Sequence, residues 1–287
     1  MSVIVMVDSG ASISKKMLKE YDIAILPYNV MFNNGDCYKD ILEVKNQKNL
    51  ISLIEQHQEI PKIDQVSRED IEDCFRKYIN NGNDILYISV SSKLSDAYKE
   101  VLEVSKKFDD SMINVIDSLN VGVGEASLAI YAKEYINKGY GLKQTAKYLN
   151  SIKHMIKSCY AVGNPLYLYK QQRYAAIDDK YMEFHQCVPI VEINDGKIIA
   201  TFNAKENSLA LQMLKNTILD YSKSLDCRCL LIAYSGDKKL AVNLKSYASK
   251  LIEGLNVEIV ENSSVVFINS GINTLSVAFL SEKKGIL

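Results

Sequence analysis

The sequence of 287 residues predicts an α/β fold with two α/β domains, the first of them built on a mainly parallel sheet. In the first half, short β-rich runs alternate with amphipathic helical segments, which is the pattern of βαβ units. In the second half, Asn-Asp-Gly at 194–196 stands between two β-rich runs and predicts an antiparallel hairpin. We therefore expect an N-terminal α/β domain over residues 1–160 and a C-terminal α/β domain with a hairpin over residues 161–287.

The elements of the first half follow from apolar periodicity and from capping signals. The run VIVMVDS at 3–9 is apolar and β-branched, so it predicts a strand that ends in a polar turn. The segment SREDIEDCFRKYINNG at 67–82 begins with acidic residues and ends at a glycine, as helices commonly do. By the same criteria we expect strands at 23–32, 84–90 and 113–118, and helices at 14–22, 95–108 and 122–139.

The second half mixes antiparallel and βαβ elements. A helix that leads into a strand is expected over 141–163, and the hairpin over 186–202. The remaining expected elements are helices at 208–225 and 239–254, a strand at 227–236, and β-rich runs within 257–271 and 275–280.

Composition excludes several classes of protein. Lys and Arg number 34 against 35 Asp and Glu, so charge gives no reason to expect nucleic acid or an anionic membrane surface as a partner. Of the six cysteines, Cys227 and Cys229 are the one close pair, and their spacing suits zinc poorly. No apolar run approaches the roughly 20 residues that cross a bilayer. We expect a cytoplasmic protein with reduced thiols, no metal and no stable membrane insertion.

Four of the expected strands end in short turns of hydroxyl, amide and acidic residues. Ligands of open α/β sheets bind outside the carboxyl ends of the strands, where the N–H groups of the following helices favour anions. The turns contain Asp8, Ser9 and Ser12; Ser91, Ser92 and Ser95; Asp117 and Ser118; and Asn269 and Ser270. As a set they favour a site for a carboxylate or a phosphate, although each residue alone is also explained as a helix cap.

Nucleophilic catalysis would need a base near one of these serines. The three histidines, His57, His154 and His185, lie outside the four turns, and the chain has no G-x-S-x-G elbow, P-loop or G-x-G-x-x-G. We therefore expect no catalytic residue and no cofactor. A hydrolase or transferase that depends on Ser92 or on a metal is the alternative.

Five motifs, in this order, resemble the DegV family of bacterial fatty-acid-binding proteins. VDSGASIS resembles the opening D-S-x-A-x-[LI] of that family, and ISVSSKLSDAY resembles I-S-[IL]-S-S-x-L-S-G-T-Y. VIDSLNVGVG, PIVEINDGKI and NSGINTLSVAF resemble its V-I-D-S turn, its Asp-Gly hairpin and its closing segment. The chain is identified by these motifs as a divergent member.

The resemblance implies that two α/β domains hold one long-chain fatty acid between them, with the acyl chain in an apolar tunnel. The carboxylate would lie on hydroxyls at strand ends, and the protein would present the acid to a separate fatty acid kinase subunit rather than catalyse a reaction. A sensor of another anionic amphiphile is the alternative. The ligand-binding residues expected from the turns and the resemblance are Ser92 first, then Ser91, Ser95, Asp8, Ser9, Ile63, Gln65, Lys205, Asn269 and Ser270.

Several family positions have changed residue type in this chain. The threonine that precedes Gln65 in the family is Ile63, and the Gly-Thr that follows the serine turn is Asp96-Ala97. The arginine after the hairpin falls on Lys205, which keeps the charge but not the bidentate fork of a guanidinium. The closing histidine falls on Asn269.

Overall fold

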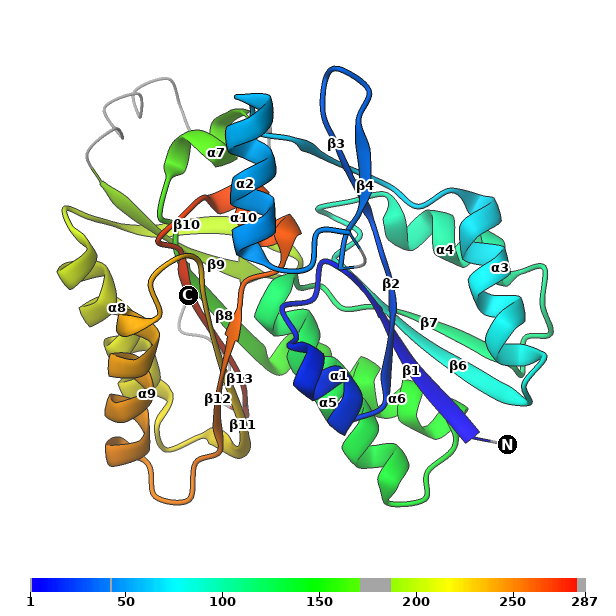
Figure 1. The fold of residues 1–287 in the computed structure, drawn as a ribbon. Helices are drawn as coiled ribbons and strands as arrows, with labels where there is room; N and C mark the ends of the chain where they lie inside the picture. The colour runs from blue at the N-terminus through cyan, green and yellow to red at the C-terminus, as the bar shows by residue number, and fades with distance from the viewer. Residues whose placement is uncertain (1, 42, 171–186, 283–287) are drawn as a thin grey trace.

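The structure is a computed structural model that describes residues 2–41, 43–170 and 187–282 (Figure 1). It is a mixed α/β fold with a parallel sheet in the N-terminal half and a second, mixed sheet in the C-terminal half, as the sequence predicts. A third, small sheet lies beside the first.

The first sheet is parallel throughout. Its strand order is β2 (Ile23–Leu26), β1 (Ser2–Asp8), β6 (Asn83–Ser89) and β7 (Ile113–Asp117). Both faces of β6 are buried, since Ile85 and Tyr87 pack on one side and Leu86 and Ile88 on the other. The helices of this half are α1 (Lys15–Glu20), α2 (Gln47–His57), α3 (Arg68–Ile79), α4 (Ala97–Ser105), α5 (Gly122–Asn137) and α6 (Leu142–Ile152). Helices α3 and α4 cover one face, and α5 and α6 cover the other.

The expected strand at 23–32 is two strands rather than one. Pro27 lacks the N–H that a ladder needs, and the chain leaves the first sheet after β2. It continues as β3 (Asn29–Met31), which forms the small sheet with β4 (Cys37–Lys39) and β5 (Lys62–Asp64). Helix α2, which we did not expect, begins after the cap residue Asn46.

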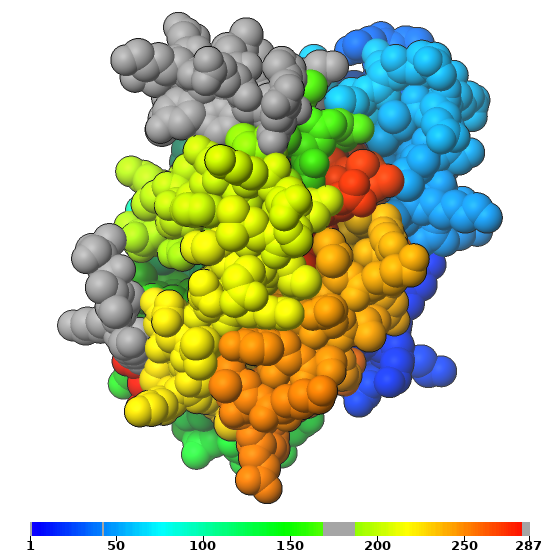
Figure 2. Space-filling model, turned by 90° about the vertical axis from the view of Figure 1, so that its left-hand side faces the viewer, coloured from blue at the N-terminus to red at the C-terminus, as the bar shows by residue number. Residues whose placement is uncertain are grey.

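The second sheet carries the predicted hairpin. Its order is β10 (Lys197–Ala204), β9 (Val188–Asn194), β8 (Ile156–Ala161), β13 (Leu275–Ser281), β11 (Leu225–Tyr234) and β12 (Val257–Glu261). Strands β9 and β10 pair antiparallel, and both residues of their turn, Asp195 and Gly196, have positive φ, as the Asn-Asp-Gly sequence predicts. Helices α8 (Asn207–Tyr221) and α9 (Lys239–Leu251) cover the outer face (Figure 2). The division that we expect at residue 160 falls inside β8.

One expected strand end is wrong. Asn269 and Ser270 close a helix, α10 (Ser264–Ser270), that begins at the cap Ser263 and ends at Gly271. A short apolar run does not distinguish a strand from a buried helix by periodicity, and this run is buried. Helix α10 packs on α2, on β5 and on α7 (Pro165–Lys170), so it touches both halves of the molecule. A short 3-10 turn, η1 (Lys153–Met155), precedes β8.

Helix α5 lies between the two sheets (Figure 1). It packs on β1 and β6 of the first sheet and on β8, β11 and β13 of the second. Every residue from Gly122 to Lys133 is buried, which explains why this helix is apolar on all sides rather than amphipathic. One continuous apolar cluster therefore joins the halves through α5.

Leu128 in this helix is fully buried in that cluster, whereas Leu219 on α8 is 47% exposed. We expect Leu128→Ala to lower the free energy of unfolding by about 2–5 kcal/mol, because it removes buried methyl groups and leaves a cavity. The matched variant Leu219→Ala should change it by no more than about 0.5 kcal/mol. Urea denaturation measures both, and equal losses in the two variants would contradict the central place of α5.

Candidate functional site

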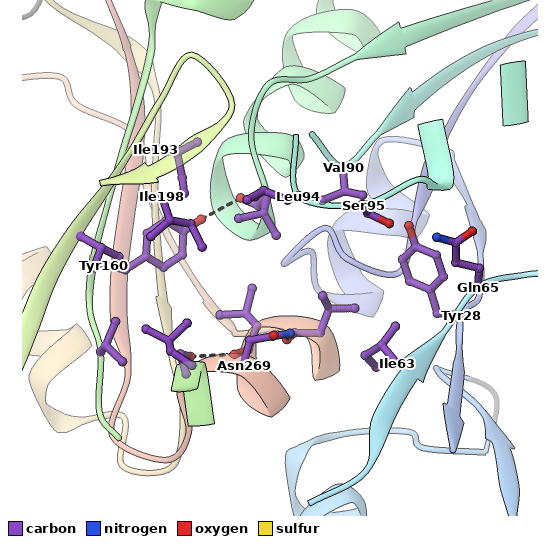
Figure 3. Close-up of a pocket in the computed structure, with 17 residues that line it drawn as sticks. Tyr28, Ile63, Gln65, Val90, Leu94, Ser95, Tyr160, Ile193, Ile198 and Asn269 are labelled. Atoms are coloured by element: carbon purple, nitrogen blue, oxygen red, sulfur yellow. Dashed lines mark hydrogen bonds between the residues drawn. The ribbon is translucent and has the colours of Figure 1, made fainter. Parts of the chain in front are cut away.

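A cavity lies between the two halves and is lined by both (Figure 3). The space inside it that no protein atom occupies is about 860 Å³, part of it open to solvent. Eleven of its seventeen lining residues are aliphatic, so it suits an apolar ligand with few polar groups. The lining residues are Tyr28, Ile63, Gln65, Val90, Leu94, Ser95, Val121, Tyr160, Val162, Leu168, Val191, Ile193, Ile198, Val265, Val266, Asn269 and Ser270.

The polar groups of the lining are unevenly placed. In Figure 3, Tyr28, Gln65 and Ser95 lie on one side of the cavity, and Tyr160, Ile193 and Ile198 lie on the other. The Tyr160 hydroxyl is already used, since it donates to the Val121 carbonyl at 2.7 Å. The Ser95 hydroxyl oxygen accepts a bond from the Ala97 N–H at 3.2 Å, which leaves its own hydroxyl proton to donate. The side with Tyr28, Gln65 and Ser95 thus offers hydrogen bonds, and the side with Ile193 and Ile198 offers apolar surface. The amide of Asn269 lies apart from both groups (Figure 3).

The structure brings five of the ten expected site residues to this cavity. These five are Ile63, Gln65, Ser95, Asn269 and Ser270. Asn269 and Ser270 reach it from helix α10 rather than from a strand end. Lys205 lines a separate surface hollow with Glu206, Ser208, Leu209 and Gln212.

The first two serines of the second turn bind protein groups instead. Ser92 donates its hydroxyl proton to Asp117 Oδ2, and its N–H to Oδ1 of the same carboxylate at 3.1 Å. Ser91 is fully buried and donates to the Gly196 carbonyl at 2.8 Å. Ser92 therefore holds the ends of β6 and β7 together, and Ser91 holds the tip of the hairpin.

The hairpin tip and the serine turn form an interdomain contact. Beside the Ser91 bond, the Lys93 ammonium lies 2.5 Å from Asp195 Oδ2. Gly196 has φ of +80°, and a Cβ there would lie 2.5 Å from the Ser91 oxygen, so the turn has no room for a side chain. This contact places Ile193 and Ile198, on either side of the tip, in the cavity wall.

Asp8 and Ser9 support the cavity from behind. Asp8 is fully buried and accepts the N–H groups of Gly10 at 2.8 Å and Val90 at 2.9 Å. Ser9 accepts the Tyr28 N–H at 3.0 Å. These bonds fix the backbone of two lining residues, Val90 and Tyr28, without bringing Asp8 or Ser9 into the lining.

A second buried carboxyl group, Glu125 in the first turn of α5, lies close to Asp8. A Cβ on Gly10 would be 2.6 Å from an Asp8 oxygen and 3.4 Å from a Glu125 oxygen. Burial, followed by the Asp8 charge, raises the pKa of Glu125 well above its usual range. Burial also raises the pKa of Asp8, although the N–H groups of Val90 and Gly10 oppose this. Sequence reasoning missed Glu125, for which the signal is one acid inside the apolar helix GVGEASLAIYA.

Glu125→Gln tests whether this carboxyl group is held protonated. A raised folded pKa means that wild-type stability falls as pH rises above about 4.5, the pKa of an exposed glutamate. We expect the Gln variant to be more stable than wild type at pH 8 and the difference to shrink toward pH 5, by up to about 1 kcal/mol per pH unit.

Urea denaturation at both pH values checks this, with the exposed Glu103→Gln as the control that should show no such trend. A Glu125→Gln variant that is less stable than wild type at pH 8 would show that the group is ionised.

Two other kinds of site are absent from the described residues. Within residues 2–41, 43–170 and 187–282, no group of three or more His, Cys, Asp or Glu side chains is placed to hold a metal ion. In the same part of the chain, every helix is too short or too polar to span a bilayer.

Known proteins resemble this chain in sequence and in fold. A family model described as an uncharacterised protein of the DegV family matches residues 2–282. A DegV domain-containing protein of Clostridium acetobutylicum is 27% identical over 280 residues, which are 97% of this chain and 98% of that protein.

Two solved structures from Thermotoga maritima have the same fold. One, a DegV lipid-binding protein, has a TM-score of 0.87 at 22% identity, and the match covers 99% of this chain and 100% of that protein. The other, described as revealing a fatty acid binding function, has a TM-score of 0.85 at 23% identity, and the match covers 98% of this chain and 99% of that protein. With a family model that spans nearly its whole length, the chain belongs to the DegV family.

Proposed function

We propose that this protein binds one long-chain fatty acid in the cavity between its two halves. The observation that carries the proposal is an aliphatic cavity with hydroxyl and amide groups on one side. Burial of an acyl chain contributes roughly 0.8 kcal/mol per CH₂, so a chain of about 16 carbons supplies affinity without any charged contact. The lipid-binding and fatty-acid-binding descriptions of the two Thermotoga maritima proteins support the same function here.

The acid head would lie at the side of the cavity where Tyr28, Gln65 and Ser95 meet, with Asn269 on α10 as a further contact. A surface hollow lined by Gln65, Ser92, Lys93, Leu94, Ser95 and Asp96 shares three of these residues with the cavity. The head is therefore separated from solvent by few side chains. This supports our proposal that the protein is a carrier and presents the acid to a separate fatty acid kinase subunit. We place this carrier in the cytoplasm as part of the same proposal.

An enzyme that uses Ser92 gains no support from the geometry. The Ser92 hydroxyl proton is donated to Asp117, and the base in such a pair is a carboxylate that also accepts the N–H groups of Ser92 and Leu119. Both oxygens of this carboxylate are thus already engaged in the turn. We therefore propose that Ser92 stabilises the turn and does not act as a nucleophile. We also propose that the two domains of the carrier meet near residue 160.

Native mass spectrometry of the full chain, purified from bacterial cells, tests the function itself. We expect an added mass in the range of a long-chain fatty acid that is lost under denaturing conditions. A protein that carries no such mass, and takes up none when palmitic acid is added, would contradict the proposal.

Two serine variants test the position of the head. Ser95→Ala removes a hydroxyl from the cavity lining and should weaken fatty acid binding about five- to tenfold, which is the effect of one hydrogen bond. Ser92→Ala should change the affinity less, because that hydroxyl is bound to Asp117. Displacement of a fluorescent fatty acid measures both, and a larger loss for Ser92→Ala would place the head outside the cavity.

A further inference from the structure

Among the described residues, the lining of the cavity offers a ligand no charged side chain. Its polar lining groups are hydroxyls and amides, and within the described residues no Lys, Arg, His, Asp or Glu lines it. An ionised carboxylate that leaves water for such a site loses its hydration and meets no cation among these lining residues. The same hydroxyls and amides can satisfy an uncharged head completely.

Asn269 presents an acceptor that lacks a donor. Its Nδ2 donates to the Val265 carbonyl at 2.7 Å, which fixes the orientation of the amide. Its Oδ1 is buried and has no hydrogen-bond partner among the described residues, although the side chain lines the cavity. An amide oxygen accepts hydrogen bonds and cannot donate them. An ionised carboxylate has no proton to give to this atom, whereas an un-ionised acid has one.

The buried pair Asp8 and Glu125 adds negative charge behind the cavity. Asp8 accepts two backbone N–H groups that favour its ionised form, whereas Glu125 lacks a hydrogen bond of regular geometry. The proton of the pair therefore resides on Glu125 and the charge on Asp8. The charge on Asp8 acts on a lining tyrosine: burial, and then the Asp8 charge, raises the pKa of Tyr28.

The other ionisable groups around the pair do not offset this charge. Tyr87 on β6 is fully buried beside it, and its pKa is raised by burial and then by Asp8. Lys93 faces Asp195 in the hairpin contact and is not in the lining. A second negative charge in the cavity would thus be repelled by Asp8.

From these contacts we infer that the cavity holds its fatty acid in the un-ionised form, with the acid O–H donated to Oδ1 of Asn269. The inference rests on the proposed function and adds the chemical state of the ligand. The acid takes up a proton on entering the site from neutral solution and loses it on leaving. A long-chain alcohol of similar length also has an uncharged head with an O–H, which it could donate to the same acceptor.

The ionisation state of the bound ligand can be observed directly. Palmitic acid labelled with ¹³C at its carboxyl carbon is loaded onto the full chain, and its resonance is followed from pH 5 to pH 9. An exposed carboxyl group ionises near pH 4 to 5, roughly. We expect the bound resonance to keep the un-ionised position at pH 7.5. A bound resonance at the ionised position at pH 7.5 would overturn the inference and leave the proposed function intact, whereas no bound resonance at all would overturn both.

Two asparagine variants assign the effect to its acceptor. Asn269→Leu should make the bound acid ionise at a pH at least one unit lower, a tenfold change in its affinity for the proton. Asn150→Leu is the matched control, because Asn150 also donates to the carbonyl four residues before it but is exposed on α6 and outside the cavity. The control should titrate as wild type. Identical titrations of Asn269→Leu and wild type would overturn the role of Asn269.

Discussion

The burial of helix α5 between two sheets is the constraint on which the rest of the structure depends. A helix that packs on both sides cannot have a polar face, so its buried part, Gly122 to Lys133, is apolar and rich in small residues apart from Glu125, Ser127 and Lys133. The first residue of α5, Gly122, is closely surrounded by other side chains. A Cβ on Gly122 would lie 2.9 Å from Val266 and 3.1 Å from the Tyr160 hydroxyl, so only glycine lets the helix begin against the cavity wall.

The cavity exists because the two halves close over α5 at defined points. The hairpin tip meets the serine turn through Ser91 and Lys93, and on the opposite side Ser263 meets the first turn through the Ser12 hydroxyl and the Gly10 carbonyl. Gln47 adds bonds to the backbone of Tyr234 and Gly236. Short polar side chains serve this purpose well because they satisfy buried backbone groups without filling the space between the halves.

The distribution of roles among the serines follows from geometry that spacing does not reveal. Ser91, Ser92 and Ser95 stand within five residues, yet they bind the hairpin, the end of a neighbouring strand and the first residue of α4, and of the three only Ser95 lines the cavity. The hairpin was predictable because Asp195 and Gly196 encode their own turn. Helix α10 was not, since a seven-residue apolar run has the same pattern in a buried strand.

The sequence by itself determined the alternation of β1, β6 and β7 with their helices, the hairpin and the membership of the family, because periodicity, turn residues and short motifs are local. It did not determine α2 or the small sheet. Only the tertiary structure decided which polar groups meet. Asp8 and Glu125 are 117 positions apart and form one buried pair, and Tyr28 and Asn269 line one cavity from opposite ends of the chain. Their protonation and their hydrogen bonds depend on what surrounds them in space, and that is set by the packing of two sheets on one helix.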